Sequence, residues 1–162
     1  MTNIKKDNKG FTLIELLAVI VILAVIILVA ASNIGGMTTT ARKNVLAVEG
    51  NTLVDSAKTA YQLAVLNGDI TTGNACFSLA YLYNQNFFDK GADDKYTGSV
   101  LVGENNGKYT YNFWISNGSY KLENAPSGAT GKVAVDGASS SETCGGKTGV
   151  KLFKADGTVA TQ

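Results

Sequence analysis

Residues 10–31 read Gly-Phe-Thr-Leu-Ile-Glu-Leu-Leu-Ala-Val-Ile-Val-Ile-Leu-Ala-Val-Ile-Ile-Leu-Val-Ala-Ala, an apolar run that holds one charge, on Glu15. The run has the length of about 20 residues that a helix needs to cross roughly 30 Å of hydrocarbon. A carboxylate deep in such a segment costs about 3 kcal/mol on insertion, so Glu15 predicts a function and requires a partner.

The residues that precede this run include three lysines, Lys5, Lys6 and Lys9. By the positive-inside rule, this end stays in the cytoplasm and the rest of the chain is exported. The run is longer than that of a secretory signal, and the sharp change in composition falls before it, between Gly10 and Phe11. Cleavage there would keep the helix and create an amine on Phe11, four residues before Glu15. The amine of the same chain or of a neighbour would then reach that carboxylate.

Residues 10–17, Gly-Phe-Thr-Leu-Ile-Glu-Leu-Leu, resemble at every position the processing motif of the type IV pilin family, which includes the pseudopilins. The resemblance implies that a prepilin peptidase cuts between Gly10 and Phe11 and methylates the new amine of Phe11. It also implies that Phe11 and Glu15 guide assembly into a helical filament. The alternative is a plain signal anchor with an incidental Glu. Beyond about the first 30 residues, the chain matches the family only in architecture.

The apolar helix departs from the family pattern at two places. Many members carry a Gly partway along it and a Pro near its end, where this chain has Ala24 and Ser32. Local melting of the helix is therefore less expected before Ser32, because neither residue removes a hydrogen bond or lowers helix propensity as Pro and Gly do. The nearest weak points are Asn33, Gly35 and Gly36.

A second helical pattern covers residues 37–66 and has one apolar face. Its repeating positions are Leu46, Gly50, Leu53, Ala57, Ala60 and Ala64, widened by Val54, Tyr61 and Val65. The small residues predict close packing of a sheet on this helix, in preference to a second filament seam. Asn67-Gly68-Asp69 predicts the helix end.

Residues 67–98 have weak periodicity and are expected to form a connecting region. Within it, residues 75–83 predict either a short helix or a turn-rich segment. Asp89, Asp93 and Asp94 lie close together, but their order does not fit the spacing of an EF-hand. A solvated loop is the preferred interpretation, so we expect no metal site.

Residues 99–162 predict an antiparallel sheet. Segments 99–102, 108–115 and 119–122 form a predicted three-stranded meander, separated by Asn106-Gly107 and Asn117-Gly118, both typical of type I′ hairpin turns. Further strand candidates are 132–136 and 150–154, followed by a turn at Asp156-Gly157.

Alternation in the middle strand of the meander defines two faces. Tyr109, Tyr111, Phe113 and Ile115 share the face that should pack on the helix. Lys108, Thr110, Asn112, Trp114 and Ser116 share the other. An aromatic row of this kind could also form a sugar-binding platform, but a role in the core is the preferred interpretation.

Cys76 and Cys144 both fall in the exported part, where a disulfide can form. Such a bond would add about 4 kcal/mol of stability in the chain-entropy model. Two buried free thiols remain the alternative. In members of the family, the cysteines of the C-terminal disulfide usually bracket a shorter loop than this one. Asn117-Gly118-Ser119 fits a glycosylation sequon, but the predicted turn explains the same residues.

The composition excludes several classes of function. With 14 basic and 13 acidic residues the net charge is +1, so no global field favours nucleic acid. The absence of His removes the commonest general base and metal ligand. With no phosphate-binding or nucleophile motif either, we expect no enzymatic activity and no cofactor.

The sequence therefore predicts an α+β protein with three segments: a cleaved leader at 1–10, a transmembrane and filament-core helix at 11–36, and an exported globular domain at 37–162. The expected function is that of a structural subunit of an extracellular type IV pilus, serving adhesion, twitching motility or biofilm formation. The alternatives are a pseudopilin of a type II secretion or competence DNA-uptake system and a membrane-anchored binding module that never polymerises.

The expected partners are other copies of the chain, the prepilin peptidase, the pilus assembly platform and, before assembly, the lipid bilayer. The sequence predicts no contact with nucleic acid. The precursor is expected to cross the cytoplasmic membrane once with its N-terminus in the cytoplasm. After assembly, the subunit is expected in the extracellular filament.

Overall fold

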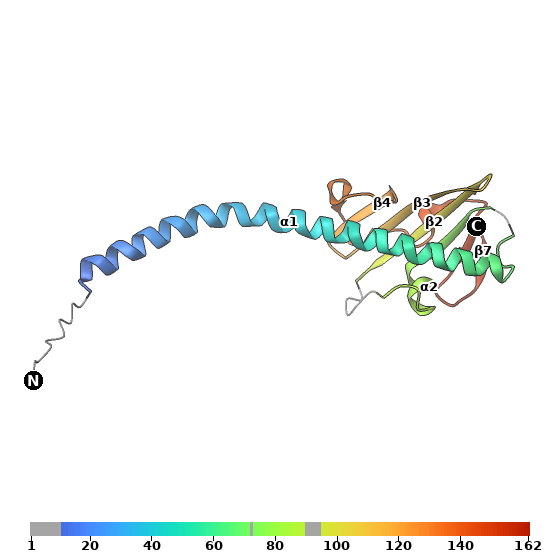
Figure 1. Cartoon of the computed structure of the whole chain (residues 1–162), viewed down its shortest axis with the longest axis horizontal. Coiled ribbons are helices and arrows are strands. Elements are labelled where there is room, and N and C mark those ends of the chain that lie inside the picture. Colours follow the sequence, from blue (N-terminus) through green and yellow to red (C-terminus); the bar gives the residue numbers. More distant parts are fainter. Residues whose placement is uncertain (1–10, 72, 90–94) are drawn as a thin grey trace, which may run out of the picture. The chain divides into compact units, whose positions relative to one another are not determined.

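The structure is a computed structural model that describes residues 11–71, 73–89 and 95–162. The chain divides into two compact units, Met1–Thr39 and Thr40–Gln162. Helix α1, Leu13–Leu66, contributes to both (Figure 1). The seven-stranded sheet lies wholly in the second unit, so the predicted α+β class is confirmed.

Helix α1 continues through Gly35 and Gly36 and ends where the sequence predicted. Gly68 has a φ of 81°, which favours glycine. The amide of Asp69 donates to the carbonyl of Ala64 (2.9 Å), and that of Gly68 donates to the carbonyl of Val65 (3.1 Å). This pair of bonds is a Schellman motif, which satisfies carbonyls of the last turn.

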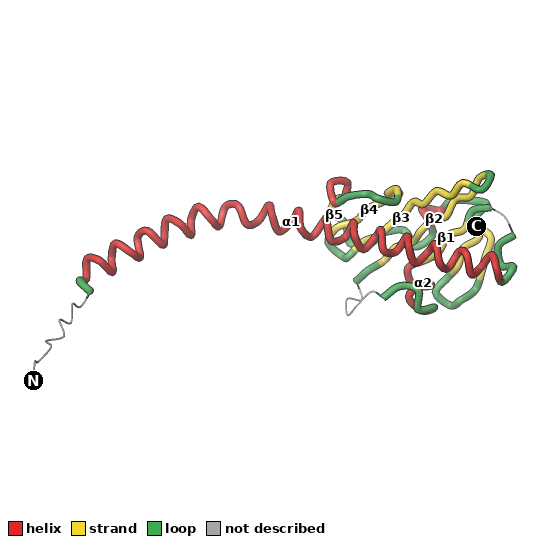
Figure 2. The backbone as a smooth tube through the Cα atoms, viewed as in Figure 1, coloured by secondary structure: helices red, strands yellow, loops and turns green. Residues whose placement is uncertain are grey.

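The sheet has the strand order β5-β4-β3-β2-β1-β6-β7, in which β1 and β6 are parallel and all other neighbours are antiparallel. The strands are β1 (Ala75–Ser78), β2 (Thr97–Asn105), β3 (Lys108–Ser116), β4 (Tyr120–Pro126), β5 (Val135–Asp136), β6 (Lys151–Phe153) and β7 (Val159–Thr161). The short helices are α2 (Leu79–Asn84), capped by the Ser78 hydroxyl, and the 3-10 turns η1 (Gly131–Val133) and η2 (Cys144–Gly146). Figure 2 shows the later turns of α1 lying across one face of this sheet.

Each face of the sheet buries its own cluster. On the face toward α1, the buried residues include Leu53 of the helix together with Phe113 and Ile115 of β3. The opposite face buries Trp114 with a second, smaller cluster. The predicted faces of β3 are confirmed for these residues, because neighbouring side chains of a strand point to opposite sides.

The expected helix face is confirmed with one exception. Leu46, Gly50, Leu53, Val54, Ala57, Ala60, Tyr61 and Ala64 are buried. Val65 is 43% exposed, so its predicted place in the apolar face is wrong. It lies in the last turn of α1, beside the exposed Leu66.

Gly50 is required by the close approach of α1 to β3. A Cβ atom at Gly50 would lie 2.2 Å from Cε2 of Phe113, whose side chain is fully buried. We expect Gly50→Ala to lower the free energy of unfolding by about 2 kcal/mol, although Ala is the better helix former by about 1 kcal/mol. Urea denaturation of the purified chain in detergent measures this loss.

Two further variants control for helix propensity. Gly35 has no atom within 4 Å of its would-be Cβ, so Gly35→Ala should leave the denaturation midpoint unchanged or slightly raised. Adding Phe113→Leu to Gly50→Ala should recover part of the loss, because the smaller side chain makes room. A midpoint that rises in Gly50→Ala alone would contradict the predicted clash.

The segment between the helix and the meander is more ordered than predicted. Residues 75–83 were expected to be a helix or a connection, but Ala75–Ser78 form strand β1 and only the following residues are helical. All four residues of β1 are buried, because Ala75 and Phe77 pack in the cluster on the α1 face and Cys76 packs in the cluster on the opposite face. A strand buried on both faces lacks alternation, which explains why its pattern was missed. The sheet is accordingly larger than the predicted range 99–162.

The turns of the meander confirm one prediction and correct another. Asn106 and Gly107 both have positive φ, 51° and 78°, as the predicted type I′ turn between β2 and β3 requires. At the second turn only Gly118 has positive φ, so the type I′ prediction is wrong there. Asn117 instead accepts backbone hydrogen bonds through Oδ1 from Ser119 (3.1 Å) and Tyr120 (2.9 Å), which forms a wider, side-chain-stabilised turn.

The last strand candidates are confirmed in part. Residues 151–153 form β6, and the predicted turn at Asp156-Gly157 joins it to β7. Of the candidate 132–136, only Val135 and Asp136 are a strand, because the preceding residues form η1. A Cβ at Gly131 in η1 would lie 2.5 Å from the backbone nitrogen of Asn44.

Candidate functional site

Helix α1 begins with a capping box formed by Thr12 and Glu15. Oε2 of Glu15 accepts hydrogen bonds from the Thr12 backbone amide (2.8 Å) and from its hydroxyl (2.9 Å). The Glu15 amide in turn faces the Thr12 hydroxyl oxygen at 3.4 Å. This reciprocal arrangement satisfies amides of the first turn that have no partner within the helix. It also places the carboxylate at the positive end of the helix dipole.

The sequence analysis missed the role of Thr12 in capping the helix. The signal was present, because Thr12-Leu13-Ile14-Glu15 has the Thr-x-x-Glu spacing of a capping box. Phe11 lies immediately before this box with its side chain 87% exposed. Gly10 and the three leader lysines lie outside the described residues. In the uncleaved chain Phe11 has no free amine, so its pairing with Glu15 stays a prediction.

The apolar run is exposed along its full length. All residues from Phe11 to Ala31 are exposed, whichever side of the helix they occupy. Among the described residues, α1 contains a window of mean hydropathy 3.3, and by length and composition it is able to cross a membrane. A helix that is apolar on all sides requires lipid or protein around it.

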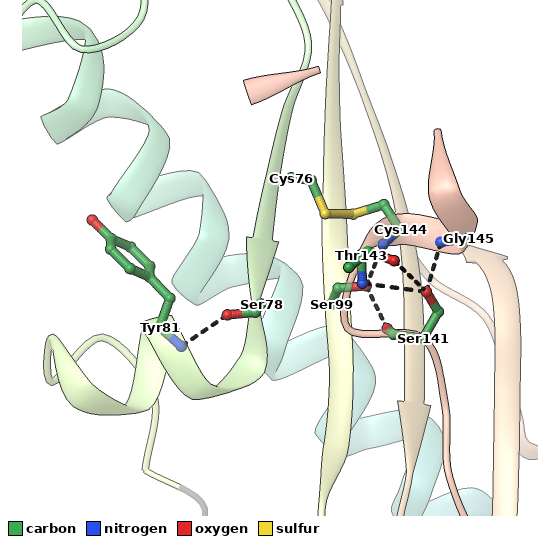
Figure 3. The surroundings of a disulfide bond; sticks show 8 residues. All are labelled: Cys76, Ser78, Tyr81, Ser99, Ser141, Thr143, Cys144 and Gly145. Atoms are coloured by element: carbon green, nitrogen blue, oxygen red, sulfur yellow. Dashed lines mark hydrogen bonds between the residues drawn. A yellow bond between two sulfur atoms is a disulfide. The ribbon is translucent and has the colours of Figure 1, made fainter. Parts of the chain in front are cut away.

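Cys76 and Cys144 form a disulfide with Cα atoms 6.1 Å apart (Figure 3). Both cysteines are fully buried on the sheet face opposite α1, in the cluster that contains Trp114 and Leu152. Cys76 belongs to β1 and Cys144 to η2, so the bond ties a central strand to the segment that follows β5. The sequence had left open whether these cysteines are bonded.

A buried hydroxyl holds the segment that carries Cys144. The Ser99 hydroxyl, on β2, donates to the carbonyl of Ser141 (2.6 Å) and accepts from the amide of Cys144 (3.0 Å). The hydroxyl oxygen of Ser141 accepts from the amides of Thr143 (3.2 Å) and Gly145 (2.8 Å), as Figure 3 shows. The disulfide therefore lies within a hydrogen-bonded loop that is already fixed to the sheet.

The comparison with protein families bears on the capping box and the helix that follows it. Residues 5–31 match the prokaryotic N-terminal methylation motif. This motif is typical of type IV pilins and pseudopilins and is recognised by prepilin peptidase, so the chain is pilin-like at its N-terminus. The matched range contains Gly10, Phe11 and Glu15. Neither curated proteins nor solved structures gave a match to the chain.

Two acidic residues late in the chain, Asp136 and Asp156, have partners within the structure. Oδ1 of Asp156 accepts from the hydroxyl (2.6 Å) and the amide (3.0 Å) of Thr158, and these bonds lower the pKa of Asp156. Asp136 lies 3.9 Å from the ammonium group of Lys43. Of the three aspartates considered for calcium, Asp93 and Asp94 lie outside the described residues. Within the ranges that the structure describes, no three metal-ligating side chains gather.

Proposed function

We propose that this pilin-like chain is a structural subunit of an extracellular type IV pilus. The observation that supports the proposal best is the exposed apolar helix, which lies within the residues that match the methylation motif. Lipid can surround such a helix in the precursor, and equivalent helices of other copies can replace lipid in a filament. The second unit has a separate core and would form the surface of that filament.

Each of the three segments has its own role in the proposed maturation and assembly of the subunit. The leader at 1–10 stays in the cytoplasm, the helix at 11–36 crosses the cytoplasmic membrane, and the domain at 37–162 is exported. Prepilin peptidase cuts after Gly10 and methylates Phe11. The assembly platform then extracts the subunit from the bilayer into a homopolymer that serves adhesion, twitching motility or biofilm formation.

A pseudopilin of a secretion or DNA-uptake system would share the motif and the helix but would build only a short filament. Electron microscopy of cells with and without the chain separates these functions. Long surface filaments that contain the chain and disappear on its deletion are the expected result. Loss of protein secretion or DNA uptake, with no surface filament in either strain, would favour the pseudopilin.

The proposed cleavage after Gly10 can be tested directly. Intact-mass measurement of the mature chain should show an N-terminus at Phe11 that carries one methyl group. We expect Gly10→Val to accumulate as the full-length precursor, because a cut between a basic leader and an apolar helix requires little side chain at that position. Lys9→Gln is the matched control and should still be cleaved. A mature chain that begins after Ala31 would contradict this assignment.

A further inference from the structure

A cleft of about 350 Å³ lies between the last turns of α1 and the first half of β3. Its walls are Lys58, Tyr61, Gln62, Val65 and Leu66 of the helix with Tyr109 and Tyr111 of the strand. The volume falls in the range of about 300–1,000 Å³ that is usual for small-molecule sites. The cleft lies within the second unit and is independent of the processing motif and the apolar run.

The two tyrosines of β3 depart from the pattern of their own strand face. Phe113 and Ile115, on the same face, are fully buried, whereas Tyr109 is 47% exposed. The rings of Tyr61 and Tyr109 meet nearly edge to face, with centroids 5.6 Å apart and an interplanar angle of 74°. Because such a contact covers at most one face of Tyr109, part of the aromatic ring remains open to a ligand.

The groups around this ring are held in position. The Tyr61 hydroxyl donates to the carbonyl of Gly73 (3.1 Å), and burial is the main reason that the pKa of Tyr61 is raised. The phenol therefore remains a donor at physiological pH. The ammonium group of Lys58 lies over the ring of Tyr111, 5.1 Å from its centroid. A site whose side chains are already ordered loses less entropy on binding.

The charge in the cleft favours a neutral ligand. Lys58 is the charged residue of the lining, and its ammonium group lies 2.7 Å from Oδ1 of Asp55. An anionic ligand would have to compete with Asp55 for Lys58. A hydroxyl oxygen can instead accept a hydrogen bond from one of the remaining N–H groups of that ammonium group without breaking the pair. The exposed amide of Gln62 adds a donor and an acceptor at the rim.

We propose that this cleft binds a neutral saccharide, with the C–H face of one pyranose ring on Tyr109 and its hydroxyl groups toward Lys58 and Gln62. The negative face of an aromatic ring attracts the weakly positive C–H groups of a sugar. The apolar Val65 and Leu66 line the cleft beside that ring. A pyranoside combines one apolar face with hydroxyls around its edge, which matches this arrangement of aromatic and polar groups.

Saturation-transfer NMR tests the proposal on the full-length chain in dodecylphosphocholine micelles, whose head group contains no sugar. The probes are cellotriose and N,N′,N″-triacetylchitotriose at millimolar concentration. Transfer to the C–H protons of one ring face of either trisaccharide is expected. Tyr109→Leu keeps an apolar side chain but removes the ring, so it should weaken binding by about tenfold. Tyr83→Leu, which replaces a tyrosine that is 40% exposed on α2, should bind as the unaltered chain does.

Three results would overturn the proposal. The first is no transfer to either trisaccharide, and the second is equal transfer in the unaltered chain and in Tyr109→Leu. The third is a cleft occupied by a second copy of the chain. Sedimentation would then show a dimer that Tyr109→Leu dissociates, and neither sugar would bind. The melting temperature of Tyr109→Leu, compared with that of Tyr83→Leu, verifies that both variants are folded.

Discussion

Glu15→Gln should be exported and cleaved like the unaltered chain, yet yield at least about tenfold fewer filaments. The substitution retains an oxygen that can accept from the Thr12 amide, so the capping box can persist. It removes the negative charge that is proposed to pair with the Phe11 amine of a neighbouring subunit. In a filament core without water, that amine would be left as an unpaired cation, which costs several kcal/mol. Intact mass gives the processed fraction, and the yield of sheared filaments gives assembly.

Two further variants separate the charge of Glu15 from its capping role. Glu15→Ala removes both, whereas Thr12→Val removes the hydroxyl but keeps the carboxylate. If pairing with Phe11 controls assembly, Thr12→Val should form filaments and both Glu15 variants should not. Normal filaments from Glu15→Gln would show that hydrogen bonding at the helix start, and not charge, is what assembly requires.

Replacing both Cys76 and Cys144 with Ala should lower the free energy of unfolding by about 4 kcal/mol. The bond joins residues 68 positions apart, so its removal returns much freedom to the unfolded chain. Removal also leaves space in the cluster that contains Trp114, because both cysteines are fully buried there. Urea denaturation of the chain in detergent, without reductant, measures the effect.

Ser99→Ala is the matched control for the disulfide. It removes the hydroxyl that bonds to Ser141 and Cys144 but leaves the covalent bond intact. Loss of a buried hydrogen-bond partner should cost about 1–3 kcal/mol. A double Cys variant that loses no more than Ser99→Ala would show that the hydrogen-bonded loop, and not the disulfide, holds this face of the sheet.

The elements that the sequence predicted correctly are those whose residues follow a regular pattern along the chain. In α1 the apolar positions from Leu46 to Ala64 recur with the helical period, and in β3 the residues alternate. Strand β1 has no wet side, since β2 and β6 flank it and both faces are covered. Its pairing with β6 depends on residues far along the chain, which a local pattern does not report.

The two turns of the meander also show that prediction from local sequence is incomplete. Asn106-Gly107 and Asn117-Gly118 are the same dipeptide, yet only the first adopts positive φ at both positions. The difference arises because the Asn117 side chain takes over hydrogen bonds to Ser119 and Tyr120. The preference of the Asn-Gly dipeptide for a type I′ turn does not take such a competing side-chain hydrogen bond into account.

For the candidate sites, the sequence was most informative where function depends on adjacent residues. The cleavage motif and the capping box both lie within residues 10–17. The cleft depends on Tyr61 and Tyr109, which belong to different elements and meet only in the fold. The row of aromatic residues in β3 predicted core packing, but only Phe113 and Ile115, at its end, are fully buried.

The parallel pairing of β1 with β6 joins two strands that are far apart in the sequence. Cys76 pairs in register with Leu152, so in a reduced chain the two strands close a loop that contains β2, β3, β4 and β5. Once Cys76 is bonded to Cys144, only the segment 145–151 remains to be closed. The shorter loop lowers the entropic cost of closure by about 2 kcal/mol. In the oxidised chain, the docking of β6 beside β1 therefore closes only a short loop, and the cost of closing the long loop has already been met by the disulfide.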